Sequence, residues 1–397
     1  MRSFFGQASG VIVATGAAAM LATTGGQAPA ATITAVSPAI STGSNILTSV
    51  AVASSSNAWA VGWVAHGAPA RTLVEHWNGK SWKVVPSPSP GGRTGQSNLY
   101  GVAVRSSAAW AVGQYWNGKA WQTLTEHWNG KAWRRVPSPN PGGSARTNYL
   151  SRVAYISKSQ AWAVGDYSTK TSDQALIERW NGRAWKIVPS PRLPWSYLQG
   201  IAVVSQKDAW AVGSFSPAKA GNKTLIEHWN GKAWKRVPSP SPGTTGQDLK
   251  SITATSSSNA WAVGWYDVGT TTKALILHWN GRSWKRVASP DPSGSVSYSA
   301  LLGVTAASSS RAWAVGSYSP AVDTYLTLIL RWNGRFWKPV TSPSPDPAHN
   351  TLWAVAMTKS AAPWAVGNAG PGTPGTSLTL TEHLTAGGWS QVASPSK

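Results

Sequence analysis

Several residue types and patterns are scarce in this chain. Cysteine is absent from all 397 residues, which excludes a disulfide framework, a thiolate metal site and a cysteine nucleophile. Acidic residues number only 13 against 35 basic ones, so the formal net charge is +22. No segment holds the 3.6-residue period of an amphipathic helix, so the sequence predicts very little helix. Any binding or catalytic site in this chain must therefore be built from few carboxylates, many cations and many aromatic rings.

Hydrophobic runs are short as well. The apolar run at residues 11–24 is interrupted by Gly and Thr and falls short of the ~20 residues that a membrane span needs. It follows Arg2 and precedes Ala28-Pro29-Ala30, a small-x-small pattern typical of signal cleavage. We therefore expect a secretory signal at residues 1–30, a leader segment at 31–44 and no membrane span. The mature protein is expected outside the cell, either secreted or associated with the envelope.

What the chain does contain is a repeat. TLVEHWNGKSWKVVPSP at residues 72–88 has close counterparts through to the C-terminus, and each copy follows the pentapeptide AWAVG or PWAVG. The Trp of this pentapeptide recurs every 48 to 52 residues, at Trp59, Trp110, Trp162, Trp210, Trp261, Trp313 and Trp364. A regular period of this length overrides the expectation of two or three unrelated domains.

Each repeat contains four short runs typical of strands. Asn-Gly separates the third run from the fourth in six of the seven copies, which predicts a tight hairpin with a type I′ turn. Pro-Ser-Pro clusters separate the repeats and exclude a continuing strand. The sequence therefore predicts an all-β, seven-bladed β-propeller of four-stranded blades over residues 45–397. Its blades are expected at approximately 45–90, 97–141, 148–192, 196–242, 247–292, 299–346 and 350–397.

The order of these features resembles a Kelch-type blade, which is also the blade of the galactose-oxidase central domain. The shared features are a strand ending in Gly, a variable loop, a further strand, a tight turn and a Trp that opens the last strand. The Kelch double Gly is a single Gly here, as in Gly62 and Gly113, and the aromatic-Asp of the third strand is His/Arg-Trp-Asn. The resemblance implies Kelch-like blade geometry. The Cys–Tyr cofactor of galactose oxidase is excluded because cysteine is absent.

Repetition separates packing residues from candidate site residues. Twenty of the 26 Trp recur in the repeat and are expected to pack between adjacent blades. The other six, together with aromatic residues two positions after the AWAVG Gly, are expected at the face that carries the variable loops. We predict a ligand site there, formed by Trp63, Tyr115, Trp116, Trp121, Tyr167, Trp195, Trp265, Tyr266, Tyr318 and Trp353. The alternative is that these rings only pave the top of the blades.

The polar residues offer little sign of catalysis. Glu75 and its four counterparts are a repeated position, expected to pair with Lys or Arg of the fourth strand. The repeated His are replaced by Arg179 and Arg331 in two blades, and Arg is no metal ligand, so we expect no metal and no cofactor. Asp166, Asp267 and Asp323 are the candidates for an enzyme that would need two convergent carboxylates.

Fifteen cations flank the Asn-Gly turns and are expected to form a basic band near the outer rim. They are Lys80, Lys83, Lys131, Arg134, Arg135, Arg183, Lys186, Lys232, Lys235, Arg236, Arg282, Lys285, Arg286, Arg335 and Lys338. Such a band attracts anionic polymers in a salt-dependent way, or it only keeps exposed strands soluble.

These observations favour a secreted, non-catalytic binding or scaffold protein that recognises an extracellular glycan or anionic envelope polymer. We expect a monomer with no specific nucleic-acid partner. An extracellular glycan hydrolase or lyase with its site at the propeller mouth is the alternative, and a purely structural surface protein is a third interpretation.

Overall fold

The structure is a computed structural model, and it describes residues 43–66, 69–217, 221–294, 298–370 and 377–395. All regular secondary structure within these residues is strand, in 28 segments. The proposed signal at residues 1–30 and most of the leader lie outside the described residues, and the first strand begins at Ser44. No described segment forms a helix of the length and apolarity that crossing a membrane requires.

The strands form seven consecutive blades of four strands each. Blades 1 and 2 are β1 (Ser44–Ser54), β2 (Asn57–Ala65), β3 (Arg71–Trp77), β4 (Trp82–Val84), β5 (Ser97–Arg105), β6 (Ala108–Trp116), β7 (Trp121–Trp128) and β8 (Trp133–Arg135). Blades 3 and 4 are β9 (Asn148–Ser157), β10 (Gln160–Ser168), β11 (Asp173–Trp180), β12 (Trp185–Ile187), β13 (Ser196–Ser205), β14 (Asp208–Phe215), β15 (Lys223–Trp229) and β16 (Trp234–Arg236). Blades 5 to 7 are β17 (Gln247–Ser256), β18 (Asn259–Val268), β19 (Thr271–Trp279), β20 (Trp284–Val287), β21 (Tyr298–Ser308), β22 (Arg311–Ala321), β23 (Thr324–Trp332), β24 (Trp337–Val340), β25 (Asn350–Ala356), β26 (Trp364–Ala369), β27 (Leu378–Thr385) and β28 (Gly388–Gln391).

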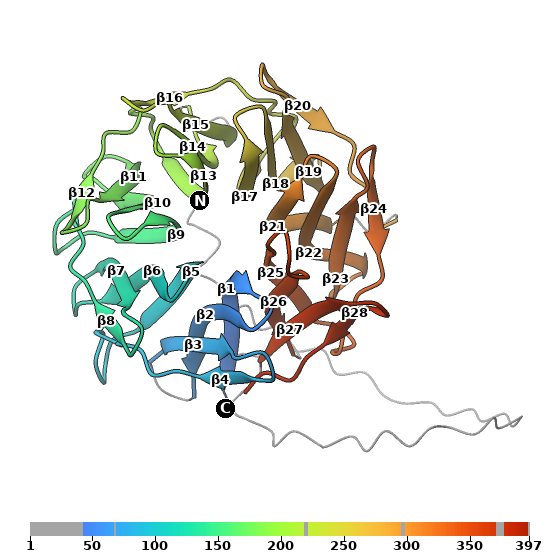
Figure 1. Cartoon of the computed structure of the whole chain (residues 1–397). Coiled ribbons are helices and arrows are strands. Elements are labelled where there is room, and N and C mark those ends of the chain that lie inside the picture. The colour runs from blue at the N-terminus through green and yellow to red at the C-terminus, as the bar shows by residue number, and fades with distance from the viewer. Residues whose placement is uncertain (1–42, 67–68, 218–220, 295–297, 371–376, 396–397) are drawn as a thin grey trace, which may run out of the picture.

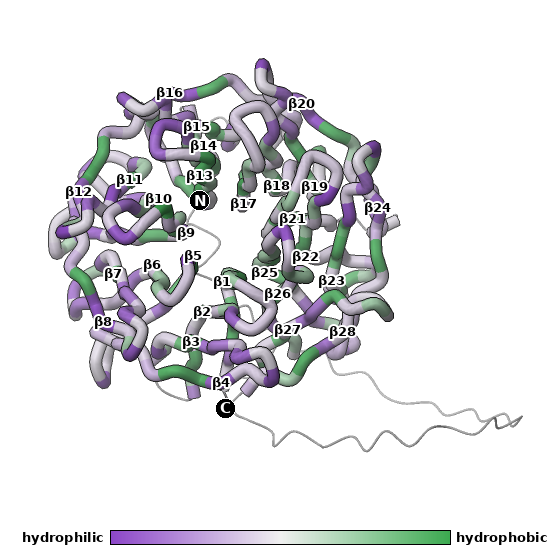
Figure 2. The backbone as a smooth tube through the Cα atoms, in the orientation of Figure 1, coloured by the Kyte–Doolittle hydropathy of each residue, from purple (hydrophilic) through white to green (hydrophobic). Residues whose placement is uncertain are grey.

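Each blade is an antiparallel meander whose first strand lies at the centre of the ring and whose fourth strand lies at the rim (Figure 1). Blades 5 and 6 share one extended sheet through a single parallel pair, Thr272 with Tyr298. Hydrophobic segments run along the strands while hydrophilic ones gather at turns (Figure 2). The predicted all-β, seven-bladed propeller is confirmed. Its second-to-third and blade-to-blade connections share one face, which we call the variable face; the other connections define the uniform face.

Repeated Trp residues form the contacts between blades. The second-strand Trp59 of blade 1 lies 4.9 Å from the ring of Trp128 and 5.2 Å, edge to face, from that of Trp133 in blade 2. Blades 7 and 1 meet through the same arrangement, with Trp364 at 4.8 Å from Trp77 and 5.1 Å from Trp82. Edge-to-face indole pairs of this kind stabilise a core beyond their buried area. The expected wedging of repeated Trp between blades is therefore observed, and the ring closes without exchanging a strand between the described parts of its first and last blades.

The Asn-Gly turns have a different form from the one predicted. The hairpins exist, but the loop is four residues long, since Trp77 pairs with Trp82 across residues 78–81. Gly79 has a φ of +93°, whereas Asn78 is not among the described residues with positive φ. The Asn78 side chain instead accepts hydrogen bonds from the backbone N–H groups of Lys80 and Ser81 at 2.9 and 3.0 Å. The type I′ prediction is wrong because this side-chain cap organises the loop in place of a second left-handed residue.

The repeated Glu residues also differ from expectation. Four of them accept a hydrogen bond from the Ser of a Ser-Pro dipeptide that follows the fourth strand of the preceding blade, as Glu178 does from Ser138 at 2.6 Å. The pairing expected with Lys or Arg of the fourth strand is not what holds these four, because the carboxyls point inward and are fully buried. For Glu126, the charge of Arg135 does oppose the effect of burial. The bond from Ser394 to Glu75, at 2.8 Å, joins the last blade to the first.

Candidate functional site

Every first strand contains a β-bulge at the mouth of the central channel. In blade 1 Leu47 pairs with Gly62 and Ser49 pairs with Val61, so Thr48 has no partner of its own in the ladder. The same register shift recurs in all seven blades, and the extra residues are Thr48, Tyr100, Ser151, Gln199, Lys250, Leu302 and Trp353. A bulge re-aims its extra side chain and is often found beside a functional site. The residues at these seven positions are unlike one another, although the bulge itself repeats.

The Gly of AWAVG is what permits this bulge. A Cβ added to Gly264 would lie 1.9 Å from the carbonyl oxygen of Asp248 on the neighbouring strand, and the other six Gly approach a first-strand carbonyl just as closely. No real Cβ tolerates such a distance, so any other residue would force the two strands apart. A constant Gly on the second strand thus positions a variable residue on the first.

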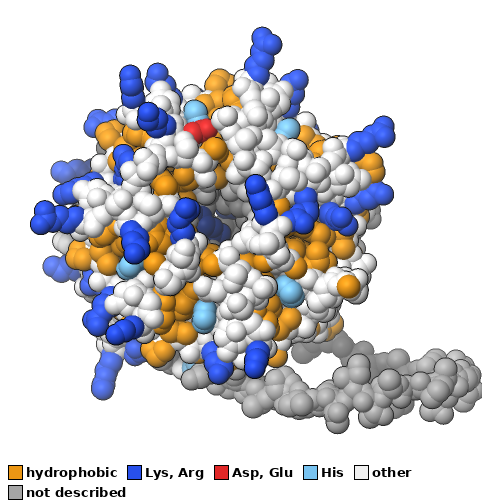
Figure 3. All heavy atoms as spheres, viewed as in Figure 1, with side chains coloured by type: hydrophobic (Ala, Val, Ile, Leu, Met, Phe, Trp, Pro, Cys, Tyr) orange, Lys and Arg blue, Asp and Glu red, His pale blue; other side chains and the backbone are white. Residues whose placement is uncertain are grey.

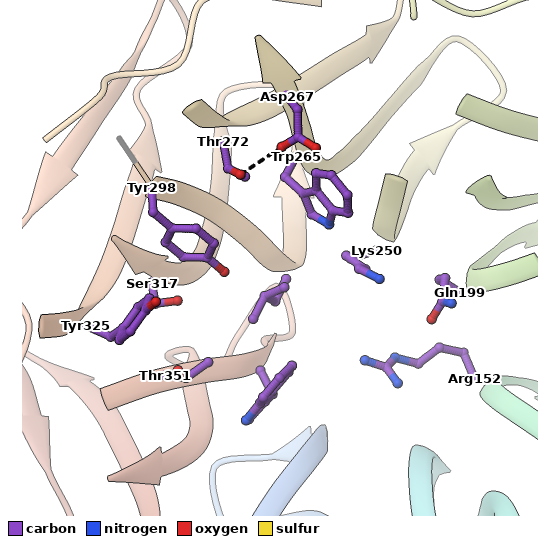
Figure 4. Close-up of a pocket in the computed structure, with 12 residues that line it drawn as sticks. Arg152, Gln199, Lys250, Trp265, Asp267, Thr272, Tyr298, Ser317, Tyr325 and Thr351 are labelled. Carbon is purple, nitrogen blue, oxygen red and sulfur yellow. Dashed lines mark hydrogen bonds between the residues drawn. The ribbon is translucent and has the colours of Figure 1, made fainter. Parts of the chain in front are cut away.

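The bulged residues of blades 4 to 7 line a cavity of about 430 Å³ at the variable face (Figure 4). Loop-end residues of the same blades complete it, since Trp265, Asp267 and Thr272 come from the β18–β19 hairpin. The remaining lining residues are Arg152, Tyr298, Ser317, Tyr325 and Thr351. In blades 1 and 3 the bulged residue is instead bonded to the protein: Thr48 and Ser151 donate to the carbonyls of Leu99 and Leu198 in the next blade. The cavity is therefore confined to one side of the channel mouth.

Polar and charged side chains line the cavity on two opposite sides. Arg152, Gln199 and Lys250 enter it from one side, while Tyr298, Ser317 and Tyr325 face it from the other (Figure 4). Lys250 forms an ion pair with Asp248 at 2.7 Å. Asp267 accepts a hydrogen bond from the Thr272 hydroxyl at 2.8 Å. Burial raises the pKa of Tyr298, which keeps this phenol protonated and able to donate.

Two of the predicted aromatic residues, Trp265 and Trp353, lie in this cavity. The Trp353 indole N–H donates to Asn368 at 2.7 Å, which fixes the orientation of the ring. Trp265 stands over Gly246, whose backbone could carry no Cβ without meeting the Asp267 carboxylate at 2.8 Å. Hydrogen bonds from Asp267 N–H to Gly246 and from Thr244 N–H to Asp267, each 2.8 Å, tie this loop to the hairpin. Both indoles are thus held by local contacts and are half-buried.

The other non-repeated Trp residues lie elsewhere. Trp116 and Trp121 pair across the β6–β7 hairpin with ring centroids 5.6 Å apart. They flank Asn117-Gly118-Lys119-Ala120, a copy of the turn at residues 129–132, so this pair has the same turn-closing place as Trp128 and Trp133. Trp63 is half-buried on β2. Trp195 is 44% exposed in the loop before blade 4 and has a φ of +51°.

The aromatic residues two positions after the AWAVG Gly do not line the cavity. Tyr115 lies under the Arg135 guanidinium at 4.4 Å and accepts a hydrogen bond from it at 2.7 Å. Tyr266 has the same relation to Arg286 of its own blade. Tyr167 and Tyr318 pack against the cores between blades. Alternation along the strand explains this placement, because the neighbouring position, occupied by Trp265 in blade 5, points to the opposite face of the sheet.

The candidate catalytic carboxylates are not brought together. Asp267 lines the cavity, whereas Asp166 is buried elsewhere and Asp323 is exposed at the β22–β23 turn with a φ of +56°. Burial, followed by the nearby charge of Asp173, raises the pKa of Asp166 well above its usual range. Within the described ranges no three His, Asp or Glu side chains cluster in a way that could hold a metal ion. The repeated His are instead bonded and stacked, as His228 is to Asp208 at 2.8 Å and to the ring of Trp210 at 4.1 Å.

All fifteen residues of the predicted basic band are exposed. They lie on the fourth strands and on the turns before them, which are at the rim of the ring. Lys and Arg side chains stand around the circumference in Figure 3, and acidic side chains are nearly absent from the face in view. The burial of the repeated Glu leaves this surface with little negative charge to offset the band.

Arg152 was not among the predicted residues, although the sequence carried a signal for it. At the register position opposite the Val of AWAVG, the other six blades have Ser49, Gly101, Gly200, Ser251, Gly303 and Ala354. The comparison of repeats that singled out the extra Trp residues also singles out this Arg. Lys250 shares the bulged position of Trp353 and is marked in the same way.

The fold and the channel-mouth cavity define the chain as a β-propeller. No protein-family model matches it, and no curated protein does either. Among solved structures, YCF48 bound to a D1 peptide is similar at a TM-score of 0.50 and 13% identity, over 84% of this chain and 92% of that one. An ulvan lyase of polysaccharide lyase family PL25, bound to GlcA(1-4)Rha3S, is similar at a TM-score of 0.51 and 9% identity, over 86% and 91%. A fucose-specific lectin from Aleuria aurantia matches at a TM-score of 0.46 and 10% identity, over 89% and 95%. At these identities the similarity to YCF48 and to the ulvan lyase shows the propeller fold and nothing finer.

Proposed function

We propose that the chain is a secreted, non-catalytic carbohydrate-binding propeller with its ligand in the channel-mouth cavity. One observation carries this proposal: four unlike bulged residues, Trp353 among them, and a second indole that the repeat does not require, Trp265, converge on one cavity of about 430 Å³. That volume falls within the range of about 300–1,000 Å³ that is usual for small-molecule sites. Kelch-type ancestry of the blade and a monomeric state belong to the same proposal.

A sugar matches the chemistry of the lining. The C–H face of a pyranose ring can stack on Trp265 or Trp353, because indole offers a large, rigid, electron-rich face. The hydroxyls around such a ring would meet Gln199, Asp267 and Thr272, which supply both donors and acceptors. A propeller of similar fold that binds a saccharide is already represented by the ulvan lyase.

Substitution of the cavity indoles tests the proposal. We expect Trp265→Ala and Trp353→Ala each to lower glycan affinity by about tenfold or more, equivalent to about 1.4 kcal/mol, as for buried aromatic contacts in other sites. Trp195→Ala is the matched control, since Trp195 is exposed and outside the cavity. Affinity would be measured by calorimetry with neutral and acidic oligosaccharides at about 50 mM and about 500 mM salt.

The salt series separates this cavity from the basic band. Binding that survives high salt and depends on the two indoles supports the cavity. Binding that is restricted to polyanions, vanishes in high salt and is unchanged in both indole variants would show that the basic band is the only active surface. The proposed carbohydrate site would then be abandoned.

A glycan hydrolase or lyase is the second candidate, favoured by the presence of Asp267 and Arg152 around one cavity. The paired carboxylates of a hydrolase need a second acid within about 5–10 Å, and Asp267 is the sole carboxylate among the described lining residues. Incubation with each glycan that binds, followed by assays for new reducing ends and for unsaturated uronate absorbance, decides between binding and cleavage. We expect neither product.

A further inference from the structure

Arg152 occupies a position that the propeller otherwise reserves for small residues. A Cβ on Gly101, Gly200 or Gly303 would approach the next blade's first strand to within 2.8, 3.1 and 2.9 Å of its Cα atom. Neighbouring first strands therefore leave little room for a side chain at this level of the channel. Packing alone favours Ser, Gly or Ala there, as in the other six blades, and does not account for a long cationic side chain.

The guanidinium is anchored without being neutralised. Its Nη1 donates to the carbonyl of Tyr100 at 2.6 Å and to that of Ser151 at 2.9 Å. No carboxylate in the described part of the chain forms an ion pair with it, and burial lowers the pKa of Arg152. A guanidinium has five N–H donors in a planar fork that suits carboxylate or sulfate oxygens. The two carbonyl contacts hold this fork at the edge of the cavity, into which the side chain extends (Figure 4).

The other charged residues around the cavity do not provide Arg152 with an anionic partner. Lys250 is already matched by Asp248 at 2.7 Å. Asp267 lines the cavity next to Trp265 and Thr272, and in Figure 4 it lies apart from Arg152. An anion at Arg152 would gain a charge-assisted bond, whereas an anion at Asp267 would be repelled. The cavity therefore favours a ligand that is charged at one end and hydroxylated at the other.

Resting on the proposed function, we infer that the cavity binds an acidic sugar unit, with its carboxylate or sulfate group at Arg152. The sugar ring would then lie against the indoles of Trp265 or Trp353, and its hydroxyls would face Asp267 and Thr272. A densely charged polymer, with an anionic group at every position around the ring, does not fit because of Asp267.

The test compares matched pairs of ligands and variants. The probes are hyaluronan, alginate and carrageenan oligosaccharides, each beside its carboxyl-reduced or desulfated counterpart, with dextran as the neutral reference. Calorimetry at about 300 mM salt screens the exposed basic band more than the partly enclosed cavity. We expect at least one acidic probe to bind more tightly than its neutral counterpart, by about tenfold or more. The carboxylate and sulfate arms identify which oxyanion is preferred.

Arg152→Gln is expected to remove that preference, lowering the affinity for the acidic probe on the order of 10- to 100-fold and leaving its neutral counterpart nearly unchanged. Lys232→Gln is the charge-matched control, because Lys232 is exposed in the basic band. Gln199→Glu is a second variant that keeps Arg152 and its carbonyl contacts. It should weaken the acidic probe selectively by placing a competing carboxylate on the same side of the cavity. Thermal melting establishes that each variant is folded.

The outcomes distinguish the two proposals. Equal affinity for acidic and neutral members of every pair, unchanged in Arg152→Gln and Gln199→Glu, would overturn the role of Arg152 while leaving a neutral carbohydrate site. The absence of binding to every oligosaccharide, dextran included, would overturn the carbohydrate site and the acidic preference together.

Discussion

Five repeated Glu side chains are buried in a protein that has few acids. Burial raises the pKa of Glu75 and Glu227 to about 7 and that of Glu178 and Glu382 to about 8, while a Ser hydroxyl in the preceding blade opposes the shift. Burial also raises the pKa of Glu126 well above its usual range. These carboxyls are therefore neutral, or close to it, in the folded protein under mildly acidic conditions. An unfolded Glu has a pKa of about 4.3, so the native state binds more protons over the intervening range.

Stability should consequently fall as the pH rises through 7 and 8. A carboxyl with a raised folded pKa contributes its full stabilisation below the unfolded pKa and loses it as pH passes the folded pKa. For Glu178, with a pKa of about 8, each pH unit between the unfolded pKa and pH 8 removes about 1.4 kcal/mol of stability, and the loss is complete above pH 8. We expect Glu178→Gln to melt at a higher temperature than the native sequence at pH 9 and to show a smaller decrease between pH 6.5 and 9.

The range above pH 6.5 is chosen because burial lowers the pKa of His76, His127, His278 and His383. Those side chains contribute stability that is lost only as the pH falls below about 6.5. Asp323→Asn is the control, since Asp323 is exposed. If Glu178→Gln melts with the same pH dependence as the native sequence, Glu178 is already ionised in the folded state.

At the scale of the strand, the first-strand bulge connects fold and site. It sets an unpaired residue, different in kind from blade to blade, beside a constant Gly of the second strand, and four of these residues line the cavity. The backbone geometry thus stays fixed while the chemistry at the channel mouth varies. In many proteins, loops supply the variable residues of a binding site. Here the β-bulge of the first strand supplies them.

Two Gly substitutions separate the structural part of the bulge from its functional part. Gly264→Ala and Gly113→Ala should each destabilise the fold by about 1–3 kcal/mol or more, because each Cβ would lie 1.9 Å from a backbone carbonyl. Gly264 lies opposite the bulge that presents Lys250, whereas Gly113 lies opposite the bulge of Tyr100, which is outside the cavity. Glycan affinity, measured below the melting temperature, should fall in Gly264→Ala alone. Equal affinity in the two variants would show that the bulge does not position the site.

The sequence predicted most of the blade and part of the site. Four strands, their hairpins and the Trp contacts between blades follow from the repeat and from local turn chemistry. Trp265 and Trp353 were identified because they are absent from the repeat. The bulge was not predicted, because a one-residue register shift changes the pairing without changing the hydrophobic pattern. Tyr115 was expected at the mouth, but alternation along β6 turns its side chain to the face of the sheet that does not line the cavity.

The Glu bonds and Arg152 were missed for different reasons. The bond from Ser138 to Glu178 spans two blades, and its geometry depends on how closely adjacent blades approach. A nearer cation in the sequence suggested the wrong partner. Arg152 was detectable from the repeat comparison, but its burial and its lack of a carboxylate partner in the described structure are tertiary facts.

At the scale of the whole molecule, one type of contact closes the ring. Trp364 packs on Trp77 and Trp82 between blades 7 and 1 as Trp110 packs on Trp180 and Trp185 between blades 2 and 3. Both second-strand rings are fully buried. The difference between these two contacts is connectivity, since the chain links blade 2 to blade 3 directly.

Loss of the Trp364 indole, between blades 7 and 1, should therefore promote local opening of the propeller more than loss of the Trp110 indole, between blades 2 and 3. Trp364→Ala and Trp110→Ala should each cost about 3–5 kcal/mol, as is usual for a buried Trp. In Trp364→Ala, hydrogen exchange should accelerate mainly in β1–β4 and β25–β28, because no connecting segment holds those blades together. In Trp110→Ala, hydrogen exchange should also accelerate, but not mainly in the first and last blades. Identical exchange patterns in the two variants would contradict this role of closure.

Because blades 7 and 1 meet through the same Trp contacts as blades 2 and 3, the packing of the blades does not depend on where the chain begins and ends. Consider a circular permutant in which a linker joins the existing ends and the chain is opened between two other blades. It would retain the Trp contacts between blades and the hydrogen bonds from Ser to Glu. Its cavity would still lie between the same blades. The fold is thus determined by the cyclic order of the blades, and the place of the chain ends between blades 7 and 1 does not determine how the blades pack.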